Sequence, residues 1–425
     1  MSPDNEQRST GGDDDFAERP LCTSRFASAR WERGRLVVTS LRAGMAIECD
    51  DVALLVVLDC FRSPRTPAEV ARDPAVAEID DVVELARQLY AREILVPAGC
   101  ERRPPHDEGP YEADSFWAVP ELGLQVHSRE AAPAGSDGFR FHGRARWEPA
   151  VKPPMGARRL ALPPPPPPPE AAFWDLVRRR RSIRRADGPI ALAALSCFLH
   201  WTARNWDEYE APGGETLVHR LYPSGGSLYA HEVYPVVPEG AVEGLGAGVY
   251  HYCPRGHALE VLPVEDEAAT AGSAAPVEDE AATADASASA NTIDSLVEIA
   301  RRISAPPPSY DGVERDPGER SPRVLLLITT RIARAAHKYD HIAYATQLKD
   351  VGCLFAHFYL VATALGLAPC AYGGGFPTRL LARVTGVDPL REPIVGEFGL
   401  GAASADAASE FGFWPGRDAP RGSEP

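Results

Sequence analysis

Seven consecutive prolines at residues 163–169 restrict the folding of this 425-residue chain more than any other feature of its sequence. Proline has a fixed φ and no amide N–H, so such a run can enter neither a helix interior nor a central strand. It should instead form a stiff polyproline II rod of about 20 Å. We therefore expect two separately folded regions, joined by a Pro-rich connection over residues 101–169.

The region 21–100, before this connection, has the pattern of a small domain of short strands and helices. Its sequence Thr66-Pro67-Ala68-Glu69 is a capping box with proline at the first helical position, which predicts a helix start. Apolar periodicity predicts strands at 35–40, 44–49 and 94–96, and helices over 52–58 and from about 80 to 92. Residues 1–20 are polar and acidic, and we expect a disordered tail there.

Residues 170–417 predict a domain of the α+β class, because helices and strands are mixed without strict alternation. The strongest helix is expected from 341 to 365, where apolar residues recur at helical spacing. Strands are expected at 216–221, 232–237, 248–253, 259–262 and 323–330. The segment PVEDEAATA occurs twice within residues 263–290, and this acidic, Ala-rich insertion is expected to be disordered. Residues 418–425 form a C-terminal tail.

The charge of the chain disfavours two classes of partner. A formal charge of −16 argues against nucleic acid and anionic membranes, because such binding depends on many Lys and Arg side chains. The helix expected from about 80 to 92 has more acids than arginines, which disfavours DNA binding by the first region. The N-terminus lacks the apolar core of a signal peptide, and no apolar run approaches the ~20 residues of a spanning helix. We therefore expect a cytoplasmic protein.

The eight cysteines are scattered and form no CxxC pair, so reduced thiols and no metal site are expected. His251 and His257 flank Cys253, but the alternating pattern of this stretch favours a β-hairpin over a metal site.

Three segments of the second region have residues suited to a flat, anionic ligand. Within residues 180–184, guanidinium forks and a hydroxyl match the geometry of a phosphate monoester. The loop 222–229 follows an expected strand, and its small residues allow backbone N–H groups to approach a flat ligand. Residues 373–375 are three glycines with the same property. Each segment alone is also compatible with a solvated basic face or an ordinary turn.

Taken together and in this order, the segments resemble the SagB-type dehydrogenases, the azoline-oxidising branch of the nitroreductase-like flavoproteins. The matching stretches are RRSIR (180–184), YPSGGSLYAHEVY (222–234), GVYHYCPRGHALEVL (248–262) and GLAPCAYGGGF (366–376). The resemblance covers most of residues 170–400 and implies a nitroreductase-like fold, FMN as cofactor and a homodimer with the flavin at its interface. The cofactor-binding residues that it implies are Arg180, Arg181, Ser182, Arg184, Pro223, Ser224, Gly225, Gly226, Gly374 and Gly375.

The chain also departs from this family pattern. Family members often carry a Gln-Asn pair near the position of Ala356 and His357, and many relatives have a basic residue where this chain reads Gly-Leu-Gly-Ala at 399–402. Some FMN contacts are therefore expected to be lost or replaced, with Arg417 as a candidate substitute.

The region 21–100 resembles a winged helix of the PqqD-like type, which binds a leader peptide in peptide-modifying enzymes. That match rests on the order of the expected elements.

The chain has only three lysines, Lys152, Lys338 and Lys349, against 41 arginines. Unlike arginine, a lysine can lose its proton when it is desolvated, so each lysine is a candidate for chemistry. Lys338 and Tyr339 match the Lys-Tyr pair of the azole-forming oxidases and are the expected catalytic residues. Azoline oxidation requires hydride transfer to flavin and proton removal to a base, which this pair could supply. Adjacent helical residues do not face each other, so contact between the two side chains is not implied.

The expected activity is that of an FMN-dependent oxidoreductase which converts thiazoline or oxazoline rings of a peptide into azoles. The partners implied by the resemblance are an azoline-containing precursor peptide, a cyclodehydratase complex and a second copy of the chain. Two alternatives remain. One is a general nitroreductase-like NAD(P)H:FMN oxidoreductase, and the other is a non-catalytic peptide-docking subunit whose flavin site has decayed.

Overall fold

The computed structural model describes residues 13–50, 52–99, 118–130, 147–156, 158–183, 186, 188–212, 214–262, 324–373 and 378–403. These residues belong to two compact units, residues 1–137 and residues 138–425. Each unit has its own hydrophobic core. The acidic insertion 263–290, the tail 418–425 and Arg417 lie outside the described residues.

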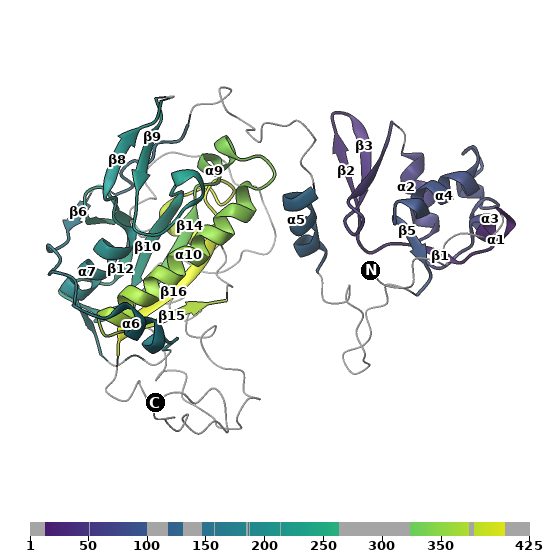
Figure 1. Cartoon of the computed structure of the whole chain (residues 1–425). Helices are drawn as coiled ribbons and strands as arrows, with labels where there is room; N and C mark the ends of the chain where they lie inside the picture. Colours follow the sequence, from purple (N-terminus) through teal and green to yellow (C-terminus); the bar gives the residue numbers. More distant parts are fainter. Residues whose placement is uncertain are drawn as a thin grey trace, which may run out of the picture. The chain divides into compact units, whose positions relative to one another are not determined.

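The first unit combines a three-stranded antiparallel sheet, in the order β2-β3-β4, with the strand pair β1-β5 and short helices (Figure 1). Its elements are α1 (Asp13–Ala17), β1 (Leu21–Thr23), β2 (Ala27–Glu32), β3 (Arg35–Ser40), β4 (Met45–Cys49), α2 (Ala53–Cys60), α3 (Pro67–Val70), η2 (Pro74–Val76), α4 (Val82–Ala91), β5 (Leu95–Pro97) and α5 (Val119–Glu130). Leu36 and Val38 alternate along β3, so both side chains enter the core that α2 and α4 cover.

The sequence predicts most of this unit well. The elements β3, β4, α2, α4 and β5 begin and end within two residues of their expected bounds. The capping box is present, since Thr66 Oγ1 accepts from the Glu69 N–H (3.2 Å) and Glu69 Oε2 accepts from the Thr66 N–H (2.9 Å). The expected disordered tail differs, because it includes α1, whose Phe16 packs into the core. The PqqD-like winged helix remains a prediction.

The second unit is built on a seven-stranded sheet in the order β15-β16-β14-β10-β12-β13-β6, in which every neighbouring pair is antiparallel (Figure 1). Its elements are β6 (Arg158–Ala161), α6 (Phe173–Arg179), β7 (Ile190–Ala191), α7 (Leu192–Ala203), β8 (Asp207–Glu210), β9 (Thr216–His219), η4 (Gly225–Ser227), β10 (His231–Val237), β11 (Val242–Glu243), β12 (Gly248–Cys253), β13 (Ala258–Val261), β14 (Val324–Thr330), α9 (Ile332–Lys338), α10 (Ala343–Ala364), β15 (Leu367–Tyr372), α11 (Thr378–Thr385) and β16 (Ile394–Ala402).

Apolar side chains on both faces of the sheet explain why its central strands are fully buried. On one face, Leu326 of β14 and Phe398 of β16 pack against Phe358 of α10, and α7 adds to the same core. On the other face, Leu327 of β14 packs in a second cluster with Leu381 of α11. Helices on both faces of an antiparallel sheet confirm the α+β class, and the expected strands and long helix are all present. None of the described helices combines the length and apolar content that crossing a bilayer requires.

The second unit begins earlier than the sequence indicates. Strand β6 pairs with β13, so residues 158–161 belong to the sheet, although they fall in the expected connection 101–169. The proline run starts directly after this strand and contains no helix or strand. Its first residue is held in place, because Ser196 of α7 donates a hydrogen bond to Pro163 O (2.5 Å).

A row of buried charges crosses the face of the sheet that α11 covers. Glu232 of β10 pairs with Arg331 (2.9 Å) and with His251 of β12 (3.1 Å), and the other ring nitrogen of His251 contacts Glu260 (2.9 Å). Burial alone would raise the pKa of Glu232, but the charge of Arg331 and the contact with His251 outweigh it and lower the pKa to about 2. His251 is thus held by carboxylates, while His257 contacts Ser196 and Tyr252 instead.

We predict that Glu232→Gln lowers the free energy of unfolding at pH 7 by about 3–5 kcal/mol, because it removes the buried carboxylate that pairs with Arg331 and His251. The Glu232 carboxylate has a depressed pKa, so its contribution is present above its ordinary pKa of 4.5 and is lost as the pH falls toward 2. The difference in the free energy of unfolding between wild type and variant should therefore shrink as the pH falls from 4.5 toward 2. Urea unfolding at several pH values measures it, with the exposed Glu243→Gln as control. Equal stabilities at pH 7 would contradict the prediction.

Candidate active site

Lys338 and Tyr339 lie where α9 ends. Lys338 is the last residue of the helix, and Tyr339 already has an extended backbone (φ −108°, ψ 139°). Because the chain leaves helical geometry between the two residues, their side chains are free to converge. Lys338 Nζ lies 5.9 Å from the ring centre of Tyr339.

The Pro-Ser-Gly loop is anchored to α10 by the carboxylate of Asp350. Ser224 Oγ donates to Asp350 Oδ2 (2.7 Å), and the Gly225 N–H donates to the same oxygen (2.9 Å). Asp350 is only 6% exposed, and burial raises its pKa although both hydrogen bonds act in the opposite direction. Ser224 Oγ also accepts from the Tyr229 N–H (3.1 Å), which closes the loop on itself.

The backbone of this loop is strongly curved. Gly226, Ser227 and Tyr229 all have positive φ values, of 63°, 55° and 44°. Such values are uncommon for residues other than glycine, and they concentrate at functional sites where the surroundings hold them. Here the Tyr229 side chain is held by a hydrogen bond from its hydroxyl to Arg220 O (3.1 Å).

The loop and the Lys-Tyr pair meet at Gly226. A methyl group on Gly226 would lie 2.6 Å from Lys338 Nζ and 2.8 Å from Tyr339 Oη. Lys338 Nζ is also 3.5 Å from Gly226 O. A methyl group on Gly225 would lie 2.6 Å from Thr346 Cγ2 of α10. A methyl group at either position would therefore force Lys338, Tyr339 or Thr346 to move, because α9, α10 and the loop approach one another closely there.

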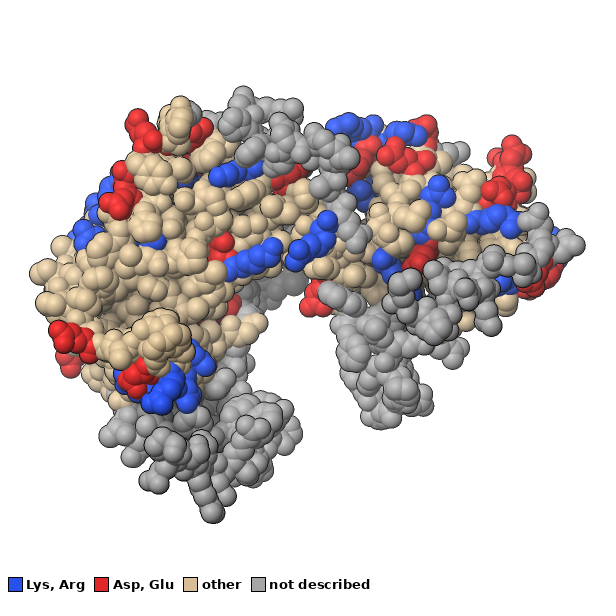
Figure 2. All heavy atoms as spheres, viewed as in Figure 1, with Lys and Arg blue, Asp and Glu red and all other residues tan. Residues whose placement is uncertain are grey.

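The arginine segment lies at a different point of the same unit. Ser182 Oγ and Tyr359 Oη of α10 form a hydrogen bond (2.7 Å), and the Tyr359 hydroxyl also accepts from the Ala371 N–H of β15 (2.8 Å). The Arg180 guanidinium lies 5.2 Å from the Tyr359 ring centre. Basic side chains gather beside α6 (Figure 2). Arg181 folds its guanidinium back onto the carbonyls of Arg178 and Arg180 (2.6 and 2.7 Å).

The two groups of candidate residues contact α10 on opposite sides. Asp350 and Tyr359 are nine residues apart, which at 3.6 residues per turn corresponds to roughly half a turn of net rotation and about 13 Å along the axis. The structure thus unites Ser224, Gly225 and Gly226 with Lys338 and Tyr339. It places Arg180 and Ser182 apart from them, on the other side of the helix.

The remaining candidates contribute less to this picture. Arg184, Gly374 and Gly375 lie outside the described residues, and Pro223 is exposed. Of the other lysines, Lys349 is exposed on α10, whereas Lys152 Nζ contacts Glu392 Oε2 (2.5 Å) and Tyr234 Oη (2.7 Å).

Two residues that organise the site were not identified from the sequence. Asp350 anchors the Pro-Ser-Gly loop, and Tyr359 joins the arginine segment to α10 and β15. Asp350 did leave a signal, because it falls on the apolar stripe of α10 with Val351, Leu354 and Phe358. An acid on a core-facing stripe needs a buried partner. Tyr359 left no comparable signal.

Comparisons with known proteins give one family. The model of the nitroreductase family matches residues 177–402, more than half of the chain. A search of curated proteins gives no significant match.

Several solved structures are similar in fold. A protein described as a nitroreductase from Ralstonia eutropha is 19% identical, with 61% of this chain and 100% of that chain covered and a TM-score of 0.38. The Escherichia coli microcin synthetase McbBCD complex with truncated pro-MccB17 bound gives 22% identity, 53% and 70% coverage and a TM-score of 0.36. A nitroreductase with bound FMN from Bacteroides fragilis gives 13% identity, 55% and 90% coverage and a TM-score of 0.30.

We predict that Gly226→Ala lowers the free energy of unfolding more than Gly240→Ala does. Both glycines have a φ near +65°, so alanine at either position must adopt a left-handed conformation, which lowers the free energy of unfolding by about 1–2 kcal/mol. Gly240 has open space around it, whereas a methyl group on Gly226 would overlap with Lys338 and Tyr339 and add roughly 1–3 kcal/mol. Urea unfolding of the two variants measures the difference. Equal losses would mean that the pair does not lie against the loop.

Proposed function

Because the chain belongs to the nitroreductase family, we propose that it is an FMN-dependent dehydrogenase that oxidises azoline rings of a peptide to azoles. The observation that carries this proposal is the convergence of Lys338 and Tyr339 on Gly226. The Lys-Tyr pair resembles that of the azole-forming oxidases. It lies against the Pro-Ser-Gly loop, which in the SagB-type dehydrogenases lies beside the flavin ring. A general flavin reductase needs no such pair.

The cofactor is FMN, and the residues of the loop fit a flat ring. Gly225 and Gly226 present backbone without side chains, and Asp350 keeps this backbone in position. The resemblance assigns the phosphate and ribityl chain to Arg180, Arg181, Ser182 and Arg184, and further contacts to Gly374 and Gly375. Residues 178–181 are four consecutive arginines, and Asp175 pairs with Arg178 and Arg179, so the segment carries a net positive charge that suits this phosphate.

The enzyme works as a homodimer in which each flavin site takes residues from both copies. Support comes from the opposite placement of the two groups on α10, because one flat cofactor cannot readily contact both sides of the same helix. A second copy can bring its own loop to the arginine segment of the first. The exposed apolar side chains Tyr344 and Leu348 on α10 offer a surface for such a contact.

The protein residues handle the proton. The oxidation removes two hydrogens from adjacent ring carbons. FMN, when bound, would supply the acceptor for the hydride, and a base must accept the other hydrogen as a proton. Burial and the charge of Asp350 raise the pKa of Tyr339, so its phenol stays protonated near neutral pH and serves as a hydrogen-bond donor. The Lys338 amine, which lies beside the loop, is the group that takes the proton when it is in its neutral form.

The first unit binds the leader of the precursor peptide, and a cyclodehydratase complex supplies the azoline. In the described residues, β2 and β4 are the outer strands of their sheet, and each carries an exposed apolar side chain, Trp31 and Met45. An extended peptide can add to such an edge through backbone hydrogen bonds.

We predict that Lys338→Ala and Tyr339→Phe keep FMN but lower the rate of flavin reduction by about 10²- to 10⁴-fold, the usual contribution of general acid-base groups. Lys338→Arg should not restore the rate, because a guanidinium keeps its proton. The measurement is anaerobic flavin bleaching on mixing with an azoline peptide, which separates this half-reaction from reoxidation by oxygen.

Lys349→Ala is the matched control, since it removes an exposed lysine of the same unit. Bleaching of both catalytic variants at the wild-type rate would contradict the assignment of Lys338 and Tyr339 as catalytic residues. Bleaching by NAD(P)H and not by azoline peptides would favour the general nitroreductase-like activity. A protein that cannot be loaded with FMN would favour the peptide-docking subunit.

Removing residues 1–100 should raise the KM for a leader-bearing substrate more than it lowers kcat, because a remote docking site contributes binding that is equal in ground and transition states. The two units have separate cores, so the second should keep its flavin and its fold. A leaderless azoline peptide is the control and should be turned over equally by both forms. An unchanged KM for the leader-bearing substrate would exclude a docking role.

A further inference from the structure

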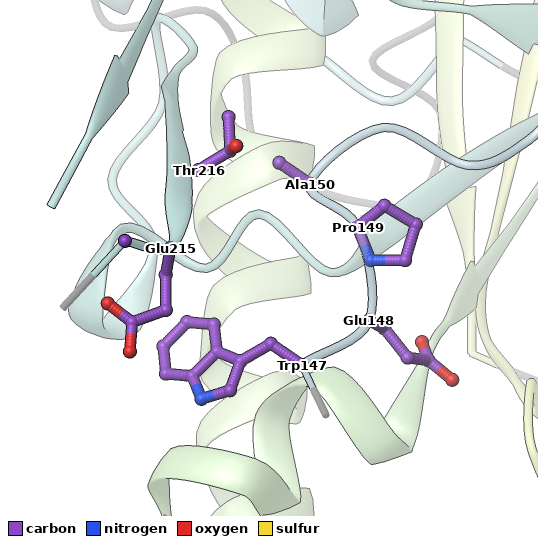
Figure 3. Close-up of a pocket in the computed structure, with 7 residues that line it drawn as sticks. Trp147, Glu148, Pro149, Ala150, Glu215 and Thr216 are labelled. Atoms are coloured by element: carbon purple, nitrogen blue, oxygen red, sulfur yellow. The ribbon is translucent and has the colours of Figure 1, made fainter. Parts of the chain in front are cut away.

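A pocket of about 750 Å³ opens in the second unit, outside the residues assigned above. Its volume lies within the range of ligand-binding cavities, roughly 300–1,000 Å³. One wall is formed by residues 147–150, and the other by residues 214–216 at the start of β9 (Figure 3). The pocket therefore lies between a segment that precedes the sheet and the hairpin β8-β9.

Both walls are fixed by buried arginines, so the pocket is preformed. The Arg334 guanidinium, 1% exposed, donates to Glu148 O (2.7 Å) on one wall and to Thr216 O (3.5 Å) on the other. Arg331 donates to Pro149 O (2.7 Å) and Ala150 O (3.0 Å). Because these wall carbonyls already accept hydrogen bonds, side chains must account for most of the recognition of a ligand.

The pocket adjoins the candidate active site through Trp147. Its indole makes an edge contact with the His337 ring, at 4.6 Å between centres, and His337 precedes the Lys-Tyr pair. Trp147 also packs on the apolar cluster that Tyr339 and Leu228 share. Arg334 ties the same region together, because its Nε donates to Leu228 O (2.6 Å) at the end of the glycine loop. The pocket and the glycine loop are thus joined through the same buried cluster.

The described part of the pocket lining has a negative charge. Among the lining residues that the structure describes, the charged side chains are Glu148 and Glu215, with no Lys or Arg. Glu148 lies 4.0 Å from Arg331, and Figure 3 shows its carboxylate pointing away from the indole. Within the described residues, the Glu215 carboxylate has neither a hydrogen-bond nor an ion-pair partner. An uncompensated carboxylate beside an indole suits a cation, which both groups attract.

We propose that this pocket is a substrate subsite for a basic side chain, an arginine or lysine that neighbours the reacting ring in the peptide. Glu215 pairs with its charge, and Trp147 contacts it through the indole. The inference rests on the proposed function for the peptide nature of the substrate. It adds a preference for the substrate residue next to the reacting ring, which the Lys-Tyr pair and the glycine loop do not supply.

The test uses thiazole-containing tetrapeptides, which resemble the product and cannot be oxidised further, with arginine or the neutral isostere citrulline next to the ring. Calorimetric titration of the full-length, FMN-loaded protein should show about 3- to 30-fold tighter binding of the arginine peptide, as expected for a cation–π contact and one exposed ion pair. The preference should weaken as salt is raised. Glu215→Gln should remove most of it, while Glu243→Gln, an exposed acid outside the pocket, should leave it intact.

Trp147→Leu provides a second variant and should also reduce the preference, with circular dichroism to show that the fold is kept. Equal binding of the two peptides, or no measurable binding of either, would reject the subsite. So would tighter binding of a phenylalanine peptide, or a preference that survives Glu215→Gln. The binding assay involves no turnover. Tighter binding of the arginine peptide by a protein that does not oxidise azolines would therefore contradict only the proposed function. Azoline oxidation without a charge preference would remove only the subsite.

Discussion

The buried carboxylate of Asp350 is the interaction on which the candidate site depends. It accepts from Ser224 Oγ and the Gly225 N–H, and these contacts fix a loop whose backbone is otherwise unfavourable. Hydrogen bonds to a charged acceptor contribute about 1.5–3 kcal/mol each, enough to offset the left-handed conformations of Gly226, Ser227 and Tyr229. Burial raises the pKa of Tyr339 and the charge of Asp350 adds to the shift, so the acid that fixes the loop also favours the protonated form of a neighbouring phenol.

Two buried arginines fix the backbone of the segment 147–150, as Asp350 fixes the glycine loop. Arg331 and Arg334 flank the start of α9, and each donates to backbone carbonyls of the segment 147–150. The same α9 ends at Lys338, so the segment, the pocket and the Lys-Tyr pair are joined through one short helix. Arg331 is in turn paired with Glu232 inside the sheet. A buried arginine is stable only with such partners, which makes these contacts mutually dependent.

The helix α10 explains why the site is organised in two parts. It is packed across the sheet through Val351, Leu354 and Phe358, while Asp350 and Tyr359 receive the glycine loop and the arginine segment on different sides. A cofactor that needs both parts is most simply bound between two copies, and this is the physical basis for the proposed homodimer. The subsite beside Trp147 belongs to the loop side of this arrangement.

The sequence by itself determined the α+β class, the central strands β10, β12, β13 and β14 and the long helix α10, because periodicity and capping are local properties. It also indicated the loop and Lys-Tyr segments as candidates for the site. It could not determine that β6 joins the second sheet or that α1 packs on the first core, since short segments acquire their structure from partners distant in the chain. Only the tertiary structure decided that Lys338 and Tyr339 converge on Gly226, that Asp350 anchors the loop, and that the arginine segment lies across α10. These are contacts between residues more than 100 positions apart, and no local pattern encodes the direction in which two such elements meet.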